Sequence, residues 1–203
     1  MENNLLEIFQ SILNINTDSV DVYSGEIQKY IKDAFTGFYI KELKDSMILS
    51  NKNIFEDNTI DMSNSLMIAS HLDSLYYGQE TKITEDGFIF GCGAVDDKPN
   101  LAVMIMLKDL ILSLKSTIIL SFTYDEECYV NGSKEVANYL SSINTNTLIL
   151  WGEKDTDTPL KDGKLMHKKI TNSELIIFPN CTHYCYLENT YVIIKIILCF
   201  LED

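Results

Sequence analysis

The sequence has little positive charge. Its 203 residues include 16 Lys and Arg against 30 Asp and Glu, a formal net charge of -14. Binding to nucleic acid needs clustered cations that release counterions from phosphates, so this balance argues against nucleic acid and against anionic membranes. With 46% hydrophobic and 23% charged residues, the composition is globular. We expect one domain, or a large domain plus a fragment of another, that acts on a small-molecule or peptide substrate.

Long hydrophobic runs are also missing. The run from Val192 to Leu201 has ten residues and contains Lys195, whereas a membrane-spanning helix needs about 20. We therefore expect a buried helix at the carboxyl end. The first residues, MENNLLEIFQSIL, carry acids where an export signal needs positive charge. Together these features predict a cytoplasmic protein.

The cysteines form no regular pattern. An odd number of cysteines at irregular spacing argues against a disulfide framework and against a structural zinc knuckle. The five are Cys92, Cys128, Cys181, Cys185 and Cys199. This usage also fits the cytoplasm.

Strand-like and helix-like segments alternate along most of the chain. The patterns predict strands over 65–73, 116–127, 147–152 and 173–179, a hairpin over 82–90, and helices over 99–115, 132–142 and 160–169. The helix over 99–115 is apolar nearly all round, so we expect it to be buried. The alternation predicts an α/β fold: a three-layer αβα sandwich with a mainly parallel sheet and no lid domain. Such sheets bind ligands at the carboxyl ends of their strands.

Two of these strands end in residues that can bind metal. His71 and Asp73, in SHLD, are two apart and point to the same side of an extended backbone. The imidazole could then ligate a metal while the carboxylate orients it. The strand over 116–127 ends in DEE, where one carboxylate can bind metal and its neighbour can hold the attacking water.

A further pair of acids, Asp96 and Asp97, comes after a glycine-rich turn and just before a helix. Capping and complementarity to the helix dipole would also account for acids at this position. His, Asp and Glu together at such strand ends and loops suit zinc hydrolysis.

The segments SHLD, DGFIFGCGAVDDK and SFTYDEEC resemble the motifs of the co-catalytic di-zinc metallopeptidases that include acetylornithine deacetylase, succinyl-diaminopimelate desuccinylase and aminoacylase. The resemblance covers about residues 1 to 140. It implies amide hydrolysis by a zinc-activated water, with one or two Zn²⁺ ions. It further implies that His71 binds one zinc, Asp73 orients it, Asp96 bridges the metals, Glu126 is the general base and Glu127 binds the second zinc.

The chain departs from this family's pattern at two positions. Cys92 stands where the family usually has Arg, and Pro99 stands where it usually has Gly. Because Pro99 removes an N–H and fixes φ, we expect the loop that holds Asp96 to be displaced. The family's inserted lid and its distant His ligand find no room in 203 residues.

The segment from about residue 144 to 203 resembles the closing part of an α/β-hydrolase of the serine esterase or lipase type. By that resemblance Asp155 would be the triad acid and His183 the base. Such an enzyme needs a nucleophilic Ser, usually in G-x-S-x-G, and the sequence contains no such motif.

The two resemblances predict a chimera of two pieces. Residues 1–142 would be a truncated zinc-peptidase-like domain and residues 143–203 an α/β-hydrolase-like segment, joined near Ser141 to Thr147 and packed into one sheet. Glu153 then has two interpretations: a further metal ligand of the zinc family, or a solvated loop residue beside the triad acid. A bolder hypothesis has His183 replace the family's missing His ligand.

The sequence thus predicts a zinc-dependent metallohydrolase that cleaves an amide bond of an N-acyl amino acid or small peptide. Two alternatives stay open: a serine-hydrolase fragment that lacks its nucleophile, and a folded remnant without catalysis.

Overall fold

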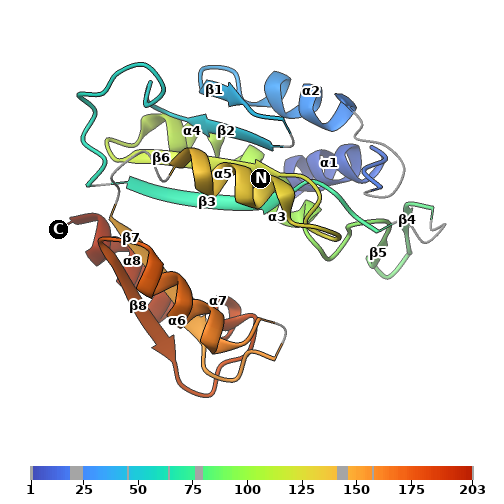
Figure 1. Ribbon diagram of the computed structural model, residues 1–203. Helices are drawn as coiled ribbons and strands as arrows, with labels where there is room; N and C mark the ends of the chain where they lie inside the picture. Colours follow the sequence, from blue (N-terminus) through green and yellow to red (C-terminus); the bar gives the residue numbers. More distant parts are fainter. Residues whose placement is uncertain are drawn as a thin grey trace. The chain divides into compact units, whose positions relative to one another are not determined.

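A computed structural model of the chain describes residues 2–18, 25–44, 46–63, 65–75, 80–140, 146–156 and 158–202. The chain forms two compact units (Figure 1). Unit 1 comprises Met1–Ile60 with Met67–Ser142, and unit 2 comprises Asp61–Leu66 with Ile143–Asp203.

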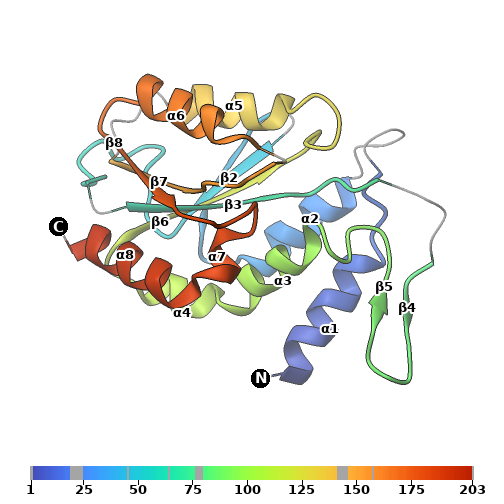
Figure 2. The same cartoon turned by 90° about the horizontal axis from the view of Figure 1, so that it is seen from below.

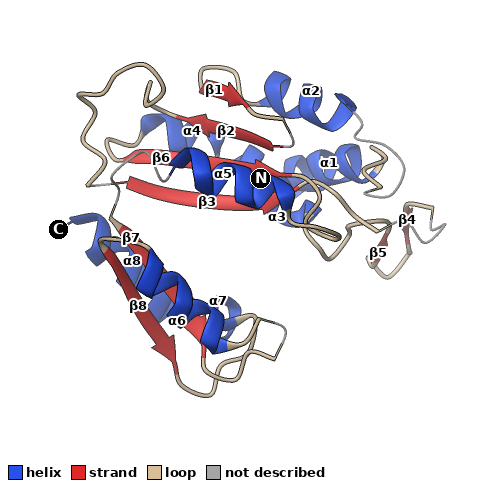
Figure 3. Cartoon of the chain, viewed as in Figure 1, coloured by secondary structure: helices blue, strands red, loops and turns tan. Residues whose placement is uncertain are grey.

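Unit 1 is built on a four-stranded sheet in the order β1-β2-β6-β3. The strands are β1 (Tyr39–Glu42), β2 (Ser46–Ser50), β3 (Ser65–His71) and β6 (Thr117–Thr123). β2 pairs antiparallel with β1 and with β6, whereas β3 and β6 point the same way (Figure 3). The N–H of Leu72 donates to the carbonyl of Thr123 over 2.7 Å, so the carboxyl ends of β3 and β6 lie together.

Helices cover both faces of this sheet (Figure 2). One face carries α1 (Glu2–Leu13), α2 (Gly25–Ala34), α3 (Lys98–Met106) and α4 (Lys108–Ser113), and the other carries α5 (Asn131–Leu140). The face below α2 is apolar: Phe122 lies opposite Met47 in the register and its ring is 5.6 Å from that of Phe35. The α5 face is more polar, because Ser46 donates to Glu135 there over 2.8 Å.

Unit 2 is a β-α-β arrangement with two more helices. Its parallel strands are β7 (Thr147–Gly152) and β8 (Ser173–Phe178), joined through α6 (Leu160–Lys169) and followed by α7 (Cys185–Glu188) and α8 (Thr190–Glu202). Trp151 packs against Gly163 of α6. A small apolar core lies between β8 and the last helices, formed by Phe178, Cys181, Cys185 and Ile193.

The predicted α/β class and layered αβα arrangement are confirmed, and the hairpin forms as β4 (Lys82–Ile83) with β5 (Ile89–Phe90). The sheet of unit 1 is mixed, since the short connection between β1 and β2 allows only antiparallel pairing. β7 and β8 pair with each other in a sheet of their own. The predicted single sheet through both segments stays a prediction.

Two helix predictions need correction. The helix predicted over 99–115 is divided at Leu107 into α3 and α4, and one side of it is exposed at Val103, Leu107, Leu110 and Leu114. α8 is likewise buried on one side only, because Tyr191, Ile194 and Leu198 are exposed. Each helix has one neighbouring layer, so one face of it suffices for packing. Among the described residues, no helix combines the length and apolar character that crossing a membrane requires.

The close approach at Gly152 predicts a stability change. A Cβ at this residue would lie 2.7 Å from the carbonyl oxygen of Cys181, so Gly152→Ala should destabilise unit 2 by about 1–3 kcal/mol. Urea unfolding followed by the fluorescence of Trp151, the single tryptophan, measures this. Gly25→Ala, where a Cβ meets nothing within 4 Å, is the control. Equal midpoints for the two variants would contradict the prediction.

Candidate metal centre

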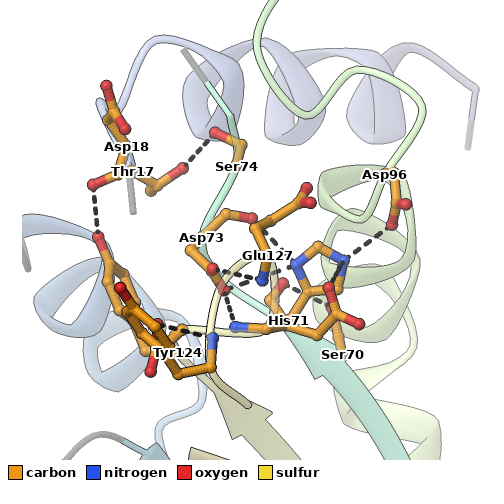
Figure 4. A network of polar contacts seen from close by, with 12 residues as sticks. Thr17, Asp18, Ser70, His71, Asp73, Ser74, Asp96, Tyr124 and Glu127 are labelled. Carbon is orange, nitrogen blue, oxygen red and sulfur yellow. Dashed lines mark hydrogen bonds and ion pairs between the residues drawn. The ribbon is translucent and has the colours of Figure 1, made fainter. Parts of the chain in front are cut away.

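His71 ends β3, and both of its ring nitrogens have partners (Figure 4). Nδ1 is 3.0 Å from the backbone oxygen of Asp73, and Nε2 is 2.8 Å from Oδ1 of Asp96. A carbonyl oxygen can only accept, so Nδ1 carries a proton and donates it. In neutral His71 this leaves the lone pair on Nε2, on the side of Asp96.

Asp73 holds the neighbouring acidic turn in place. Its buried carboxylate accepts the backbone N–H of Glu126 and of Glu127, each over 3.1 Å. Its Oδ1 is 3.7 Å from Nδ1 of His71, farther than its own backbone oxygen. The carbonyl of Asp73 therefore orients the imidazole most directly, and the carboxylate fixes the turn after β6.

The turn after β6 carries the two glutamates and begins with Asp125, whose backbone is in the left-handed region. Asp125 has φ of 68°, a conformation that Asp tolerates better than most non-glycine residues. Its carbonyl accepts the N–H of Val130 over 2.6 Å and its side chain accepts from Asn131 over 2.7 Å. The turn is thus closed by bonds of its own, and Glu126 and Glu127 extend from it.

Asp96 comes from the glycine-rich loop between β5 and α3. Gly93 in this loop has φ of +75°, which a glycine adopts without strain. The Asp96 carboxylate is 69% exposed and faces His71. Pro99 lies in the first turn of α3, where no backbone N–H is needed for an intrahelical bond. The displacement of the loop relative to the family stays a prediction.

These segments bring three metal-binding groups together. One ligand atom each from His71, Asp96 and Glu127 lies within 4.8 Å of the others, and Oε2 of Glu126 is 4.0 Å from Nε2 of His71. Imidazole nitrogen with carboxylate oxygens is a donor set that Zn²⁺ accepts. A pocket of about 230 Å³ opens beside Asp96 and Glu127, lined otherwise by Leu75 and residues 91–95.

Electrostatics at the cluster favour an added cation. Burial alone would lower the pKa of His71, but hydrogen bonds to Asp73 and Asp96 and the charges of Asp96 and Asp97 outweigh it and raise that pKa to about 10. Burial raises the pKa of the Glu127 carboxyl, and the charge of Asp96 adds to this effect. The free site therefore holds a proton on His71, and a divalent ion at these donors would replace it.

The sequence-predicted residues of unit 2 form a separate polar group. Nδ1 of His183 is 3.0 Å from Oδ2 of Asp155, and Thr158 donates to both oxygens of Asp155 over 2.8 Å. Burial opposes the ionisation of Asp155, but these bonds lower its pKa. Oε2 of Glu153 accepts the N–H of Asn180 over 3.0 Å. Asp157 and the predicted joint at 141–145 lie outside the described residues.

Sequence reasoning missed two buried polar features near the cluster. Thr17 and Ser74 share a buried hydrogen bond of 2.9 Å, and Tyr124 donates to the carbonyl of Asp18 over 3.2 Å, so the segment after α1 is attached to the ends of β3 and β6 (Figure 4). Lys98, at the start of α3, is almost fully buried. Nothing in the local pattern of either segment marks it as buried, since both contacts join parts of the chain that are far apart in sequence.

Comparison with protein-family models matches residues 67–169 to Peptidase family M20/M25/M40. The match includes His71, Asp96, Glu126 and Glu127, and it continues through β7 and α6 of unit 2. It therefore crosses the predicted joint near residues 141–147, and a chimera is not shown.

Solved structures of peptidases share the fold. Aminopeptidase PepT of Bacillus cereus is 23% identical with a TM-score of 0.52 over 66% of this chain, and the di-peptidase Dug1p of Saccharomyces cerevisiae is 14% identical with a TM-score of 0.54 over 76% of it. In both cases the matched part is 39% of the solved chain. At these identities the likeness concerns the fold alone.

A curated relative of another kind matches a shorter stretch. The 2-hydroxy-6-oxononadienedioate/2-hydroxy-6-oxononatrienedioate hydrolase 1 of Pseudomonas putida is 36% identical over 62 residues. These residues are 30% of this chain and 22% of the hydrolase. The chain therefore spans under a quarter of that relative.

The two bonds accepted by Asp73 predict the effect of removing its charge. Asp73→Asn turns one acceptor into a donor that faces a backbone N–H, and should destabilise the metal-free protein by about 1–3 kcal/mol. Asp57→Asn is the matched control, because the exposed Asp57 carboxylate also accepts a backbone N–H, that of Thr59 over 2.9 Å. Urea unfolding followed by circular dichroism compares them, and an equal loss in both variants would contradict the role of Asp73.

Proposed function

The chain belongs to Peptidase family M20/M25/M40, and from this premise we propose that it is a zinc-dependent hydrolase that cleaves the amide bond of an N-acyl amino acid or a small peptide. The observation that carries the proposal is the convergence of His71, Asp96 and Glu127 within 4.8 Å. These residues come from three segments that are far apart in sequence.

His71, Asp96 and Glu127 would hold the metal. When bound, Zn²⁺ would polarise the substrate carbonyl and lower the pKa of a water molecule. The protein's own part is to fix the donors beforehand. The carbonyl of Asp73 accepts from Nδ1 of His71 and so aims Nε2 at the cluster.

Glu126 is the proposed general base. Its carboxylate is 45% exposed and reaches the edge of the cluster, 4.0 Å from Nε2 of His71. Glu126 would take a proton from the water as its oxygen attacks the carbonyl carbon, and would deliver that proton to the amide nitrogen as the C–N bond breaks. The products are a carboxylic acid and an amine, and Glu126 regains its charge.

Two features support a small substrate with an amide bond. The pocket beside Asp96 and Glu127 has a volume of about 230 Å³, and its other lining residues are small or apolar. The solved structures that share the fold include an aminopeptidase and a di-peptidase. We extend that class of reaction to this chain as part of the proposal.

Two of the predicted ligands, Glu153 and His183, lie in unit 2. Glu153 follows β7 inside the family match, which supports its interpretation as a carboxylate of the zinc family. His183 lies beyond that match. The roles of both residues in metal binding, and the presence of one or two ions, stay predictions.

The general base provides the direct test. Glu126→Gln should keep the bound metal but lower kcat for a dipeptide or an N-acetyl amino acid by about 100- to 10,000-fold, because the amide cannot accept the proton. Metal content by mass spectrometry and hydrolysis of these substrates are the measurements. Glu85→Gln, on the exposed turn between β4 and β5, is the control. Wild-type protein that binds zinc without turnover would favour the non-catalytic alternative.

The serine-hydrolase alternative makes a separate prediction. It rests on the contact between Asp155 and His183. However, the hydroxyl of Thr158 lies 3.2 Å from Nδ1, the nitrogen already used by Asp155, and no described hydroxyl bonds to Nε2. We therefore expect no labelling by a fluorophosphonate probe. A labelled serine identified by peptide mass spectrometry would reverse this conclusion.

A further inference from the structure

Lys98 is a buried cation beside the metal centre. It is the first residue of α3, follows Asp96 by two positions, and is only 2% exposed. Its Nζ donates to the carbonyl oxygen of Ile15 over 2.9 Å. That carbonyl lies just beyond the end of α1, so the ammonium connects α3 to a segment 83 residues earlier.

The stem of Lys98 supports the loop that carries Asp96. A Cβ on Gly93 would lie 3.0 to 3.3 Å from Cγ, Cδ and Cε of Lys98. The stem therefore packs directly against the backbone of Gly93, which itself lines the pocket beside Asp96. A larger residue at position 93 would have to displace either the lysine or the loop.

The ammonium is directed away from the metal ligands. Among the described residues, no carboxylate forms an ion pair with Lys98, and the Asp96 carboxylate faces His71 instead. Asp96 is thus free of a lysine partner that would compete with a metal. Burial lowers the pKa of Lys98 to about 8, because the buried ammonium has lost most of its contact with water.

A buried ammonium carries a desolvation cost that an apolar side chain of the same length would avoid. The bond to Ile15 gives the stem a fixed direction, because it holds Nζ at one end while the backbone of α3 holds Cα at the other. The loop over 91–96 therefore packs at Gly93 against a lysine stem whose position is fixed.

We propose that Lys98 is a positioning residue of the metal centre: by joining the end of α1 to the loop over 91–96, it keeps the Asp96 carboxylate in line with His71 and Glu127. This inference rests on the proposed metal site, but the loop itself is described without reference to any metal.

The test compares Lys98→Met with Lys108→Met. Methionine keeps an unbranched apolar stem and removes the ammonium. Lys108 is the matched control, because its Nζ also donates to a backbone carbonyl, that of Ala34 over 2.7 Å, but from α4 and away from the loop. Urea unfolding of the metal-free variants measures the purely structural effect of each change.

Two readouts decide the proposal. Zinc affinity, measured by competition with a chromophoric chelator, should fall about 10- to 100-fold in Lys98→Met and stay near the wild-type value in Lys108→Met. Hydrogen exchange of the peptide over 91–96 should become faster only in Lys98→Met. This increase should be larger than the change in the free energy of unfolding of that variant accounts for.

Unchanged affinity and exchange in Lys98→Met, or equal effects in both variants, would overturn the role of Lys98. Wild-type protein that takes up no zinc would overturn the proposed function and the role of Lys98 in metal binding. In that case, the exchange of the loop still decides whether Lys98 holds it.

Discussion

The carboxylate of Asp73 accepts the backbone N–H groups of Glu126 and Glu127, and the carbonyl of the same residue accepts from His71. One buried residue thus joins the end of β3 to the turn after β6. Without it the imidazole and the two glutamates would be related only through the pairing of their strands. The arrangement works because β3 and β6 run in the same direction and end side by side, where the N–H of Leu72 bonds to Thr123.

Around this junction the protein holds several negatively charged side chains close together. The carboxylates of Asp73, Asp96, Glu126 and Glu127 gather near one imidazole, and their like charges repel one another. The raised pKa of His71 reflects this negative charge, and the backbone N–H groups of Glu126 and Glu127 offset the charge of Asp73. An ion with two positive charges would offset the combined charge more fully, which is the physical reason why this cluster suits a metal.

The extent of the family match bears on the predicted chimera. The family match runs from β3 into α6 without regard to the boundary at residues 142 and 143. The match therefore gives no support to a joint between two unrelated pieces at this boundary. In unit 2, the contact between Asp155 and His183 has the geometry of an acid that orients a base. The family match does not account for this contact, because it ends before His183.

Pattern reasoning was most accurate where the chemistry is local. The alternation of strands and helices, the hairpin over 82–90 and the positions of His71, Asp96 and Glu127 at strand ends and loops can all be read from neighbouring residues. It was least accurate for the helix over 99–115, because the break at Leu107 lies inside a continuous apolar pattern.

The sequence by itself determined which residues could bind a metal. The types of side chain and their positions at the ends of the predicted strands are sufficient to select these candidates. The tertiary structure alone decided that Asp73 serves the glutamate turn with its carboxylate and the imidazole with its carbonyl. It alone also placed the ammonium of Lys98 on Ile15 and the stem of Lys98 under Gly93. These contacts join residues tens of positions apart, and a pattern of neighbours carries no information about which distant backbone group will lie within hydrogen-bond reach.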